Sequence, residues 1–243
     1  MLGLRSLLSA CFLGFIAVIG VTGCGQGAGT TPAASIDGTT PEGASTATLV
    51  AETNNTTATT PATAPRKPTE AELHPEVVIK TSLGDIRVKL DAEKAPLTVD
   101  NFLENYVRRQ FYSDTLIHYV ASDSMIAAGG FTPKYEPKAV RAPIANEAKN
   151  GLSNKRGTLA MARDPQYAQS ATSQFFINLA DTPDLDHKNT DTSEDYGYCV
   201  FGEVIAGMEV VDAIAKVKVH DQGDFVSTPV EPVVILSVEE VAK

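Results

Sequence analysis

Hydrophobic and polar positions alternate over short stretches of the last two thirds of the chain, which is the pattern of half-buried β-strands. The first two such stretches run from Val77 to Thr81 and from Ile86 to Leu90, on either side of a polar turn from Ser82 to Asp85. A short turn between two alternating runs predicts a β-hairpin.

Two later stretches have apolar residues at helical spacing instead. The first is predicted to open at Pro96 and to bury Val99, Phe102, Leu103 and Tyr106. The second runs from Met208 to Val217, directly after Gly207. Further short strands are predicted at 116–120, 158–162, 175–179, 198–203 and 233–241. Many short strands with two helices indicate a mainly β fold, and periodicity alone does not choose between an antiparallel barrel and a sandwich.

The N-terminal end has a different pattern. An apolar run from Leu7 to Val21 follows Arg5, and it is too short for a membrane-spanning helix, so it predicts a secretory signal. The small residues before Cys24 resemble a bacterial lipobox. That resemblance implies that residues 1–23 are a lipoprotein signal peptide and that Cys24 is lipidated. An ordinary signal peptide with an incidental cysteine is the alternative.

Residues 24–74 form a linker in this interpretation. The stretch is rich in Thr, Ala, Pro and Gly and has almost no large apolar residues, so it cannot bury enough surface to offset the entropy of ordering. We expect it to be disordered, with an average span of roughly 40 Å. Residues 75–243 have the composition and length of one folded domain.

Charge narrows the range of partners. Removal of residues 1–23 takes away Arg5 alone, which leaves 19 basic and 30 acidic residues. This excess of acids argues against nucleic-acid binding and against electrostatic adhesion to anionic lipid, so the membrane contact is expected through the lipid on Cys24. Cys199 would be the one cysteine of the folded part, and its apolar surroundings predict a buried structural thiol without a disulfide.

The stretch from Arg156 to Asn178 carries the candidate binding chemistry. Two short apolar runs contain Met161, Gln174 and a pair of phenylalanines, and they are flanked by Gly and Ser. Such a pattern lines a cleft better than it fills a core, although Met161 and Phe176 could be plain core.

Three stretches resemble the cyclophilin-type peptidyl-prolyl isomerases: Gly84 to Phe102, Asn146 to Ile177 and Tyr198 to Asp212. The resemblance implies a mainly β fold, a closed eight-stranded antiparallel barrel capped by two α-helices. It also implies isomerisation of X–Pro bonds, without a cofactor or a metal, in a protein that binds proline-containing segments of unfolded or exported chains. A monomer is expected.

The resemblance also implies which residues bind substrate, namely Met125, Met161, Ala162, Arg163, Gln174, Phe176, Leu185 and Tyr198. The opposite wall departs from the family pattern. The position of the catalytic Arg holds Tyr119, the pocket Phe is replaced by Ser124, and a Gln that steadies the Arg is replaced by Ala127.

These departures predict weak catalysis. Rotation about an X–Pro bond crosses a barrier of about 18–20 kcal/mol, and only interactions that are stronger in the twisted amide lower it. Losing a charge-assisted donor costs about 1.5–3 kcal/mol, which is roughly ten- to a hundredfold in rate. The tyrosine hydroxyl could donate instead, as a neutral group. The alternatives are a non-catalytic module that binds proline-containing segments or a partner protein, and a displayed envelope lipoprotein.

Two further expectations concern other residues. The acidic stretch 181–195 could hold calcium, but its spacing fits no EF-hand loop, and a solvated loop is favoured. The histidines lack metal-ligand spacing, and His118 is expected to pack or hydrogen-bond internally. The lipid anchor predicts a place in the cell envelope facing the periplasm. Gly25, in place of an Asp, favours the outer membrane where one exists.

Overall fold

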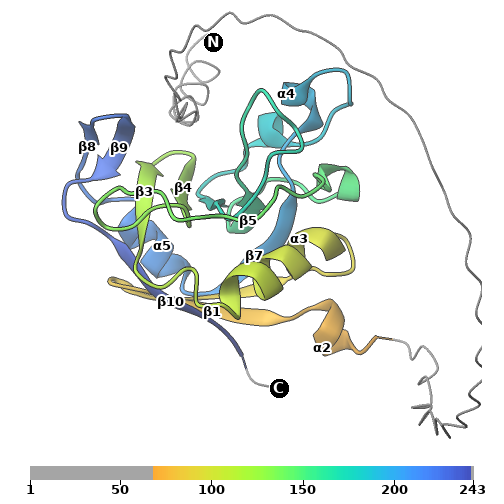
Figure 1. The fold of residues 1–243 in the computed structure, drawn as a ribbon, viewed down its shortest axis with the longest axis horizontal. Coiled ribbons are helices and arrows are strands. Elements are labelled where there is room, and N and C mark those ends of the chain that lie inside the picture. Colours follow the sequence, from red (N-terminus) through yellow and green to blue (C-terminus); the bar gives the residue numbers. More distant parts are fainter. Residues whose placement is uncertain (1–67, 242–243) are drawn as a thin grey trace, which may run out of the picture. The chain divides into compact units, whose positions relative to one another are not determined.

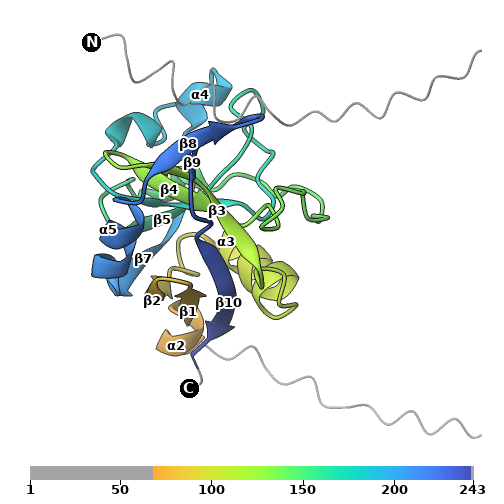
Figure 2. The ribbon, with the colours of Figure 1, turned by 90° about the vertical axis from the view of Figure 1, so that its left-hand side faces the viewer.

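The computed structural model describes residues 68–241, which form a closed barrel of antiparallel strands (Figures 1 and 2). The strand order is β1-β10-β3-β4-β6-β5-β7-β2, and β2 returns to β1. The eight strands are β1 (Glu76–Thr81), β2 (Gly84–Leu90), β3 (Thr115–Ala121), β4 (Met125–Ala128), β5 (Thr158–Met161), β6 (Phe175–Asn178), β7 (Val200–Ala206) and β10 (Val234–Glu240). The predicted eight-stranded barrel is confirmed, and the sandwich alternative is excluded.

The predicted hairpin is β1–β2. Residues Val77 and Ile79 of β1 oppose Val88 and Ile86 of β2, and all four side chains are buried in the barrel. At the turn, Gly84 has φ +137°, and a Cβ there would lie 2.8 Å from a methyl of Val210. Glycine therefore lets the turn pack directly against the helix that contains Val210.

Both predicted helices are present, but their bounds differ from the prediction. The first begins with Pro96 as α3 (Pro96–Asp100) and continues with π-helical hydrogen bonding as η1 (Asn101–Val107). Phe102 on η1 packs against Phe175 of β6 and Phe201 of β7, with ring centroids 5.8 and 5.3 Å apart. This helix therefore seals one part of the barrel core with aromatic side chains.

The second helix is α5 (Met208–Ile214), which is shorter than predicted at its C-terminal end. Gly207 precedes it in the left-handed conformation, and a Cβ at Gly207 would collide with the carbonyl oxygen of Asp85. Val211 and Ile214 are buried in the same core as the barrel strands. Figure 2 shows α3 and α5 on opposite sides of the barrel.

Several elements are absent from the sequence prediction. They are the barrel strand β4, a separate hairpin of β8 (Val219–Gln222) and β9 (Phe225–Pro229), and the short helices α2 (Glu70–Leu73), η2 (Ala148–Asn150), η3 (Pro183–Leu185) and α4 (Ser193–Tyr196). The α2 helix precedes the expected domain start at residue 75. It is tied to the barrel by a hydrogen bond from Ala92 N to Leu73 O of 2.8 Å.

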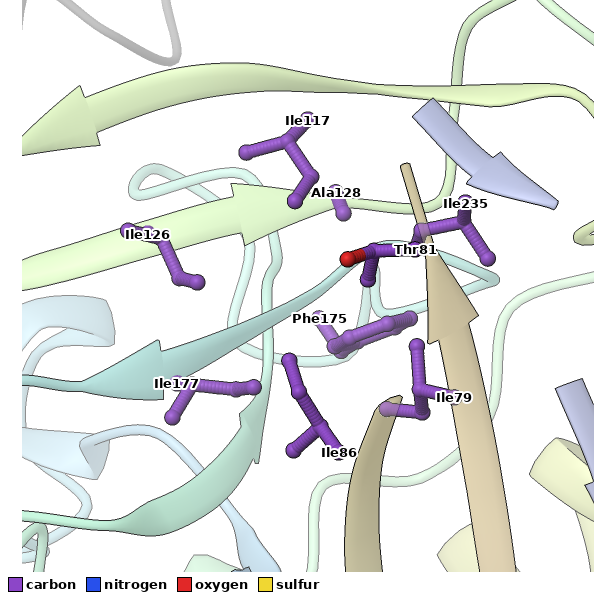
Figure 3. Close-up of a pocket in the computed structure, with 9 residues that line it drawn as sticks. All are labelled: Ile79, Thr81, Ile86, Ile117, Ile126, Ala128, Phe175, Ile177 and Ile235. Carbon is purple, nitrogen blue, oxygen red and sulfur yellow. The ribbon is translucent and has the colours of Figure 1, made fainter. Parts of the chain in front are cut away.

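The barrel interior is filled by side chains. It contains a small cavity of about 10 Å³, which is lined by Ile79, Thr81, Ile86, Ile117, Ile126, Ala128, Phe175, Ile177 and Ile235 (Figure 3). A cavity of that size accommodates at most about one water molecule, and its apolar walls offer water few partners. The barrel is therefore a packed core, and a peptide site must lie on its outside.

The predicted signal peptide, Cys24 and almost all of the predicted linker lie outside the described residues. Within residues 68–241, no helix is both long enough and apolar enough to cross a membrane.

Candidate functional site

A second apolar cluster lies on the outer face of five neighbouring strands. Side chains alternate across a strand, so β4, β5 and β6 send every other residue away from the barrel core. Ile126, Phe175 and Ile177 point into the main core, whereas Ala127 and Phe176 belong to the second cluster. Its buried members are Met125, Ala127, Ala160, Ala162, Phe176, Leu185, Tyr198 and Val200, and Tyr119 and Leu152 pack against them. We call this set the outer cluster.

The outer cluster is organised around one row of residues that crosses the sheet. Tyr119 of β3 pairs with Ala127 of β4, and Ala127 pairs with Phe176 of β6. Phe176 pairs with Ala160 of β5, and Ala160 pairs with Val200 of β7. Directly opposed side chains in antiparallel strands have Cβ atoms about 4.5–5.5 Å apart. The row therefore places the large rings of Tyr119 and Phe176 on either side of a small alanine.

A β-bulge sets the direction of Tyr119. The pairing of β3 with β4 shifts between Ile117 and Tyr119, so His118 is an extra residue in the strand. The His118 ring makes an edge contact with Phe131, with centroids 4.9 Å apart. Its Nδ1 atom is buried, and no hydrogen bond of ordinary geometry reaches it from residues 68–241. Burial lowers the pKa of His118 to about 4. The predicted internal packing of His118 is confirmed.

Phe176, Tyr198 and Leu185 form one end of the outer cluster. The rings of Phe176 and Tyr198 meet edge to face, with centroids 5.7 Å apart. The backbone N–H of Tyr198 donates to the carbonyl of Leu185 at 2.9 Å. The loop that carries Leu185 is thereby fastened to the start of β7, and three separate elements supply adjacent apolar side chains.

Gln174 and Met125 lie at opposite ends of the β4–β6 pair, because Met125 opposes Asn178 while Gln174 directly precedes Phe175, which opposes Ala128. The backbone of Gln174 accepts a hydrogen bond from Ala162 N at 2.9 Å. Its side chain crosses over Gly130, where a Cβ would be 2.7 Å from Gln174 Cδ. Gly130 therefore makes room for the Gln174 amide. Met125 begins β4 directly after Ser124, whose carbonyl accepts a hydrogen bond from Leu179 N at 2.7 Å.

Met161 is separated from the other predicted site residues. It is the last residue of β5 and Ala162 directly follows it, and the two side chains belong to clusters on opposite sides of the sheet. Met161 is buried in the main core with Leu159 and Phe175. The expectation that Met161 lines a binding wall is corrected by this position, because its side chain faces the barrel interior.

Arg163 is also turned inward. The residue is 4% exposed, and its guanidinium donates to protein carbonyls and to the Ser193 hydroxyl. The family resemblance implied that Arg163 binds substrate. In the structure these donors bind the loop before β7 and the carbonyl of the adjacent Asp164.

The acidic stretch 181–195 uses its carboxylates locally. Asp181 accepts from Arg156 N at 2.9 Å, and Asp186 accepts from Asn154 N at 2.6 Å. Asp195 accepts from the Thr192 hydroxyl at the start of α4, at 2.9 Å. Across residues 68–241, no three His, Cys, Asp or Glu side chains gather in a group that could hold a metal ion.

Cys199 is a buried free thiol, as predicted. Its sulfur lies 3.5 Å from the Thr98 hydroxyl, and burial raises the pKa of the thiol to about 12. Such a thiol stays protonated at neutral pH and is a poor nucleophile.

Sequence reasoning missed Ala160, Val200 and Leu152 as members of the outer cluster. Alternation along the strands could have found two of them, because Ala160 lies two residues before Ala162 and Val200 two residues after Tyr198. Nothing in the local sequence marks Leu152, which reaches the cluster from a loop.

Comparison with solved structures identifies the fold as that of cyclophilins. The chain matches a crystal structure of a cyclophilin-type peptidyl-prolyl cis-trans isomerase from Cryptosporidium parvum with a TM-score of 0.58 and 22% identity. The match covers 70% of this chain and 99% of that one. A structure of the same protein in the presence of the dipeptide Ala-Pro also matches with a TM-score of 0.58, at 22% identity over 69% of this chain and 99% of that one.

Sequence comparison defines the family. The family "Cyclophilin type peptidyl-prolyl cis-trans isomerase/CLD" matches residues 76–240. The chain is 50% identical over 163 residues to a peptidyl-prolyl cis-trans isomerase of Acinetobacter baylyi, covering 67% of this chain and 84% of the relative. It is 48% identical over 162 residues to peptidyl-prolyl cis-trans isomerase B of Escherichia coli, covering 67% of this chain and 97% of the relative. The chain therefore belongs to the cyclophilin-type peptidyl-prolyl cis-trans isomerase family.

Proposed function

We propose that this protein isomerises X–Pro peptide bonds at the outer cluster, at a reduced rate. The observation that carries the proposal is the cross-strand row, which brings Tyr119, Ala127 and Phe176 together on one face. Phe176, Met125 and Leu185 offer apolar contact to a proline ring, and Gln174 offers an amide to the flanking backbone. Membership of an isomerase family supports the same reaction.

The reduced rate follows from the chemistry of Tyr119. As an amide twists, the nitrogen lone pair localises and becomes a better acceptor for a donor. A guanidinium stabilises that state with a charge-assisted hydrogen bond, and a phenol supplies a neutral and weaker one. Ala127 is directly opposed to Tyr119 and carries no polar group that could orient a donor.

The test restores the missing groups in the purified protein. We expect Tyr119→Arg with Ser124→Phe and Ala127→Gln to raise kcat/KM for a proline peptide by about ten- to a hundredfold, because one charge-assisted donor is regained. NMR exchange measures the rate without a coupling protease. Ser82→Phe, on the β1–β2 turn, serves as a control for adding an aromatic side chain. Parent activity already within tenfold of an ordinary cyclophilin would refute the reduced rate.

A non-catalytic binding module is the second candidate, and the Tyr119–Ala127 pair is the observation that favours it. Titration of the parent with a proline peptide separates the two. Peptide binding without isomerisation, and a large gain in rate on restoration without a change in affinity, would identify a binding module that has kept the wall and lost the catalytic donor. A displayed lipoprotein without a binding role predicts that the peptide causes no chemical shift changes.

We further propose that the protein acts on extracytoplasmic chains from a lipid anchor at Cys24, facing the periplasm. The support is the small-residue sequence before Cys24 and the apolar run that precedes it. Expression in a bacterial host with an alkyne-labelled fatty acid tests the anchor. The parent should carry the label and sediment with membranes, and Cys24→Ala should do neither. Labelling that persists in Cys24→Ala would overturn the proposal.

A further inference from the structure

Arg163 connects the outer cluster to the loop that precedes β7. Its Nε donates to the carbonyl of Gly197 at 3.0 Å, and its Nη2 donates to the carbonyl of Ser193 at 2.6 Å. Its Nη1 donates to the carbonyl of Asp164 at 2.9 Å and to the Ser193 hydroxyl at 3.2 Å. One guanidinium therefore joins the segment after β5 to α4 and to the residue before Tyr198.

The same guanidinium lies over the ring of Tyr198. The Cζ atom is 4.4 Å from the ring centroid, which is a cation–π distance. Burial lowers the pKa of Arg163, but an arginine begins so high that the group stays charged at neutral pH. Tyr198 in turn meets Phe176 edge to face. A line of contacts thus runs from Arg163 through Tyr198 to the centre of the cross-strand row.

The backbone at Gly197 has little freedom to compensate for the loss of this contact. Its carbonyl also accepts from Asn146 Nδ2 at 3.0 Å. Its φ is +76°, and a Cβ at this position would lie 2.6 Å from His187 N. The residue directly before Tyr198 is therefore held by two side-chain donors and by tight backbone contact.

We infer that Arg163 is a positioning residue, which fixes the ring of Tyr198 against Phe176 and so shapes the proline-binding wall, and that it does not bind the peptide itself. The inference rests on the proposed function for its consequence in binding. A lysine cannot replace the arginine, because a single ammonium cannot supply the planar fork that reaches several carbonyls and stacks on a ring.

Arg163→Lys tests the inference in the free protein and in peptide binding. We expect the Tyr198 ring signals in NMR to shift and broaden, and the Tyr198 amide, which donates to Leu185 O, to exchange with solvent about tenfold faster. Affinity for a proline peptide should fall about tenfold. Arg87→Lys is the matched control, because Arg87 pairs with Glu76 on the β1–β2 hairpin, and it should change none of these readouts.

A double-mutant cycle separates positioning from direct contact. If Arg163 acts through Tyr198, Arg163→Lys should change peptide affinity by less than about twofold in a Tyr198→Leu background. An equal loss in both backgrounds would mean that Arg163 touches the peptide, and the inference would be wrong. Unchanged Tyr198 signals and unchanged affinity in Arg163→Lys would also overturn it.

A measurement on the parent protein covers the case in which the variants fold poorly. The Arg163 Nε–H should give a slowly exchanging signal with cross-peaks to the Tyr198 ring protons. A fast-exchanging signal without those cross-peaks would overturn the inference. If the parent neither binds nor isomerises proline peptides, the proposed function fails, while the Arg163 and Tyr198 signals still decide the positioning role.

Discussion

Tyr119 and Phe176 are the two large side chains of the cross-strand row, and Ala127 lies between them. Ala127 presents only a methyl group to Tyr119, so it is not a polar partner for the Tyr119 hydroxyl. The donor group that the row itself offers to a twisted amide at this end is that hydroxyl.

Removing that hydroxyl tests its role. We expect Tyr119→Phe to lower the residual isomerase rate about three- to tenfold, the effect of one neutral hydrogen bond, and to leave peptide affinity within about twofold. Tyr167→Phe is the matched control, because Tyr167 is 61% exposed in a loop. An unchanged rate in Tyr119→Phe would show that the hydroxyl takes no part in catalysis.

His118 should make stability depend on pH. Burial lowers its pKa from 6.5 to about 4, so the unfolded chain binds the proton more tightly than the folded one. Stability is therefore full above about pH 6.5 and falls as the pH drops toward 4, by about 3 kcal/mol for this group. Urea unfolding between pH 4 and 7.5 should show that the free energy of unfolding falls with falling pH in the parent, and that it falls less in His118→Phe.

His220→Gln serves as the control for that series, since His220 lies on the separate β8–β9 hairpin. Its slope should match that of the parent. Equal slopes in the parent and in His118→Phe would show that His118 is protonated equally easily in the folded and unfolded chains.

Most of the residues named from the sequence gather in the outer cluster, but the sequence could not predict how individual side chains turn. Alternation on β5 could have excluded either Met161 or Ala162, because neighbours on a strand face opposite sides. The inward orientation of the Arg163 side chain could not be predicted from the sequence. The carbonyls that accept its hydrogen bonds come from residues up to 34 positions away and meet it only in the folded chain.

At the scale of elements, glycines fix where helices and strands join. Gly207 and Gly151 have nearly equal left-handed φ values of +86° and +78°. A Cβ at Gly207 would strike the Asp85 carbonyl, whereas a Cβ at Gly151 meets nothing within 4 Å. Alanine substitutions at these two positions therefore separate two free-energy costs, that of a left-handed backbone with a Cβ and that of close packing.

We expect Gly151→Ala to lower the free energy of unfolding by about 1 kcal/mol, the cost of a left-handed residue with a Cβ. Gly207→Ala should lower it by about 3 kcal/mol or more, because the backbone of β2 must also move. Urea unfolding measures both. Equal losses would mean that the start of α5 adjusts without cost.

The elements that sequence reasoning missed have weak local signals. β4 reads Met-Ile-Ala-Ala before two glycines and is buried along its whole length, so it shows no alternation. β8 is mostly polar, and it pairs with β9 in a small separate sheet. Both strands owe their conformation to neighbours rather than to their own composition.

At the scale of the molecule, closure of the barrel depends on distant pairing. β1 and β10 are the first and last strands of the barrel, and they pair with each other from Val77 opposite Glu240 to Thr81 opposite Ile235. Local periodicity identifies both as strands but contains no information about this contact. This is why the pattern left barrel and sandwich open, and why the family resemblance was needed to choose.

Net charge should influence which proline peptides bind fastest. The chain carries a formal charge of −10, which attracts cations over a range that salt shortens. We expect a proline peptide flanked by lysines to associate several-fold more slowly at 500 mM than at 50 mM salt. The same peptide flanked by glutamates should associate faster at 500 mM than at 50 mM salt. Stopped-flow binding measures both, and identical salt responses would contradict the expectation.

The two faces of the strands have a consequence for how this protein can change. On β4, β5 and β6 one set of alternate residues packs the interior and the other set builds the outer cluster. Substitutions in the second set change the outer cluster but none of the residues that pack the main core. The chemistry of the outer face can therefore change while the composition of the core stays the same. Each residue of the cross-strand row also comes from a different strand. Evolution and the protein engineer can therefore alter the donor at 119, the spacer at 127 or the ring at 176 one at a time.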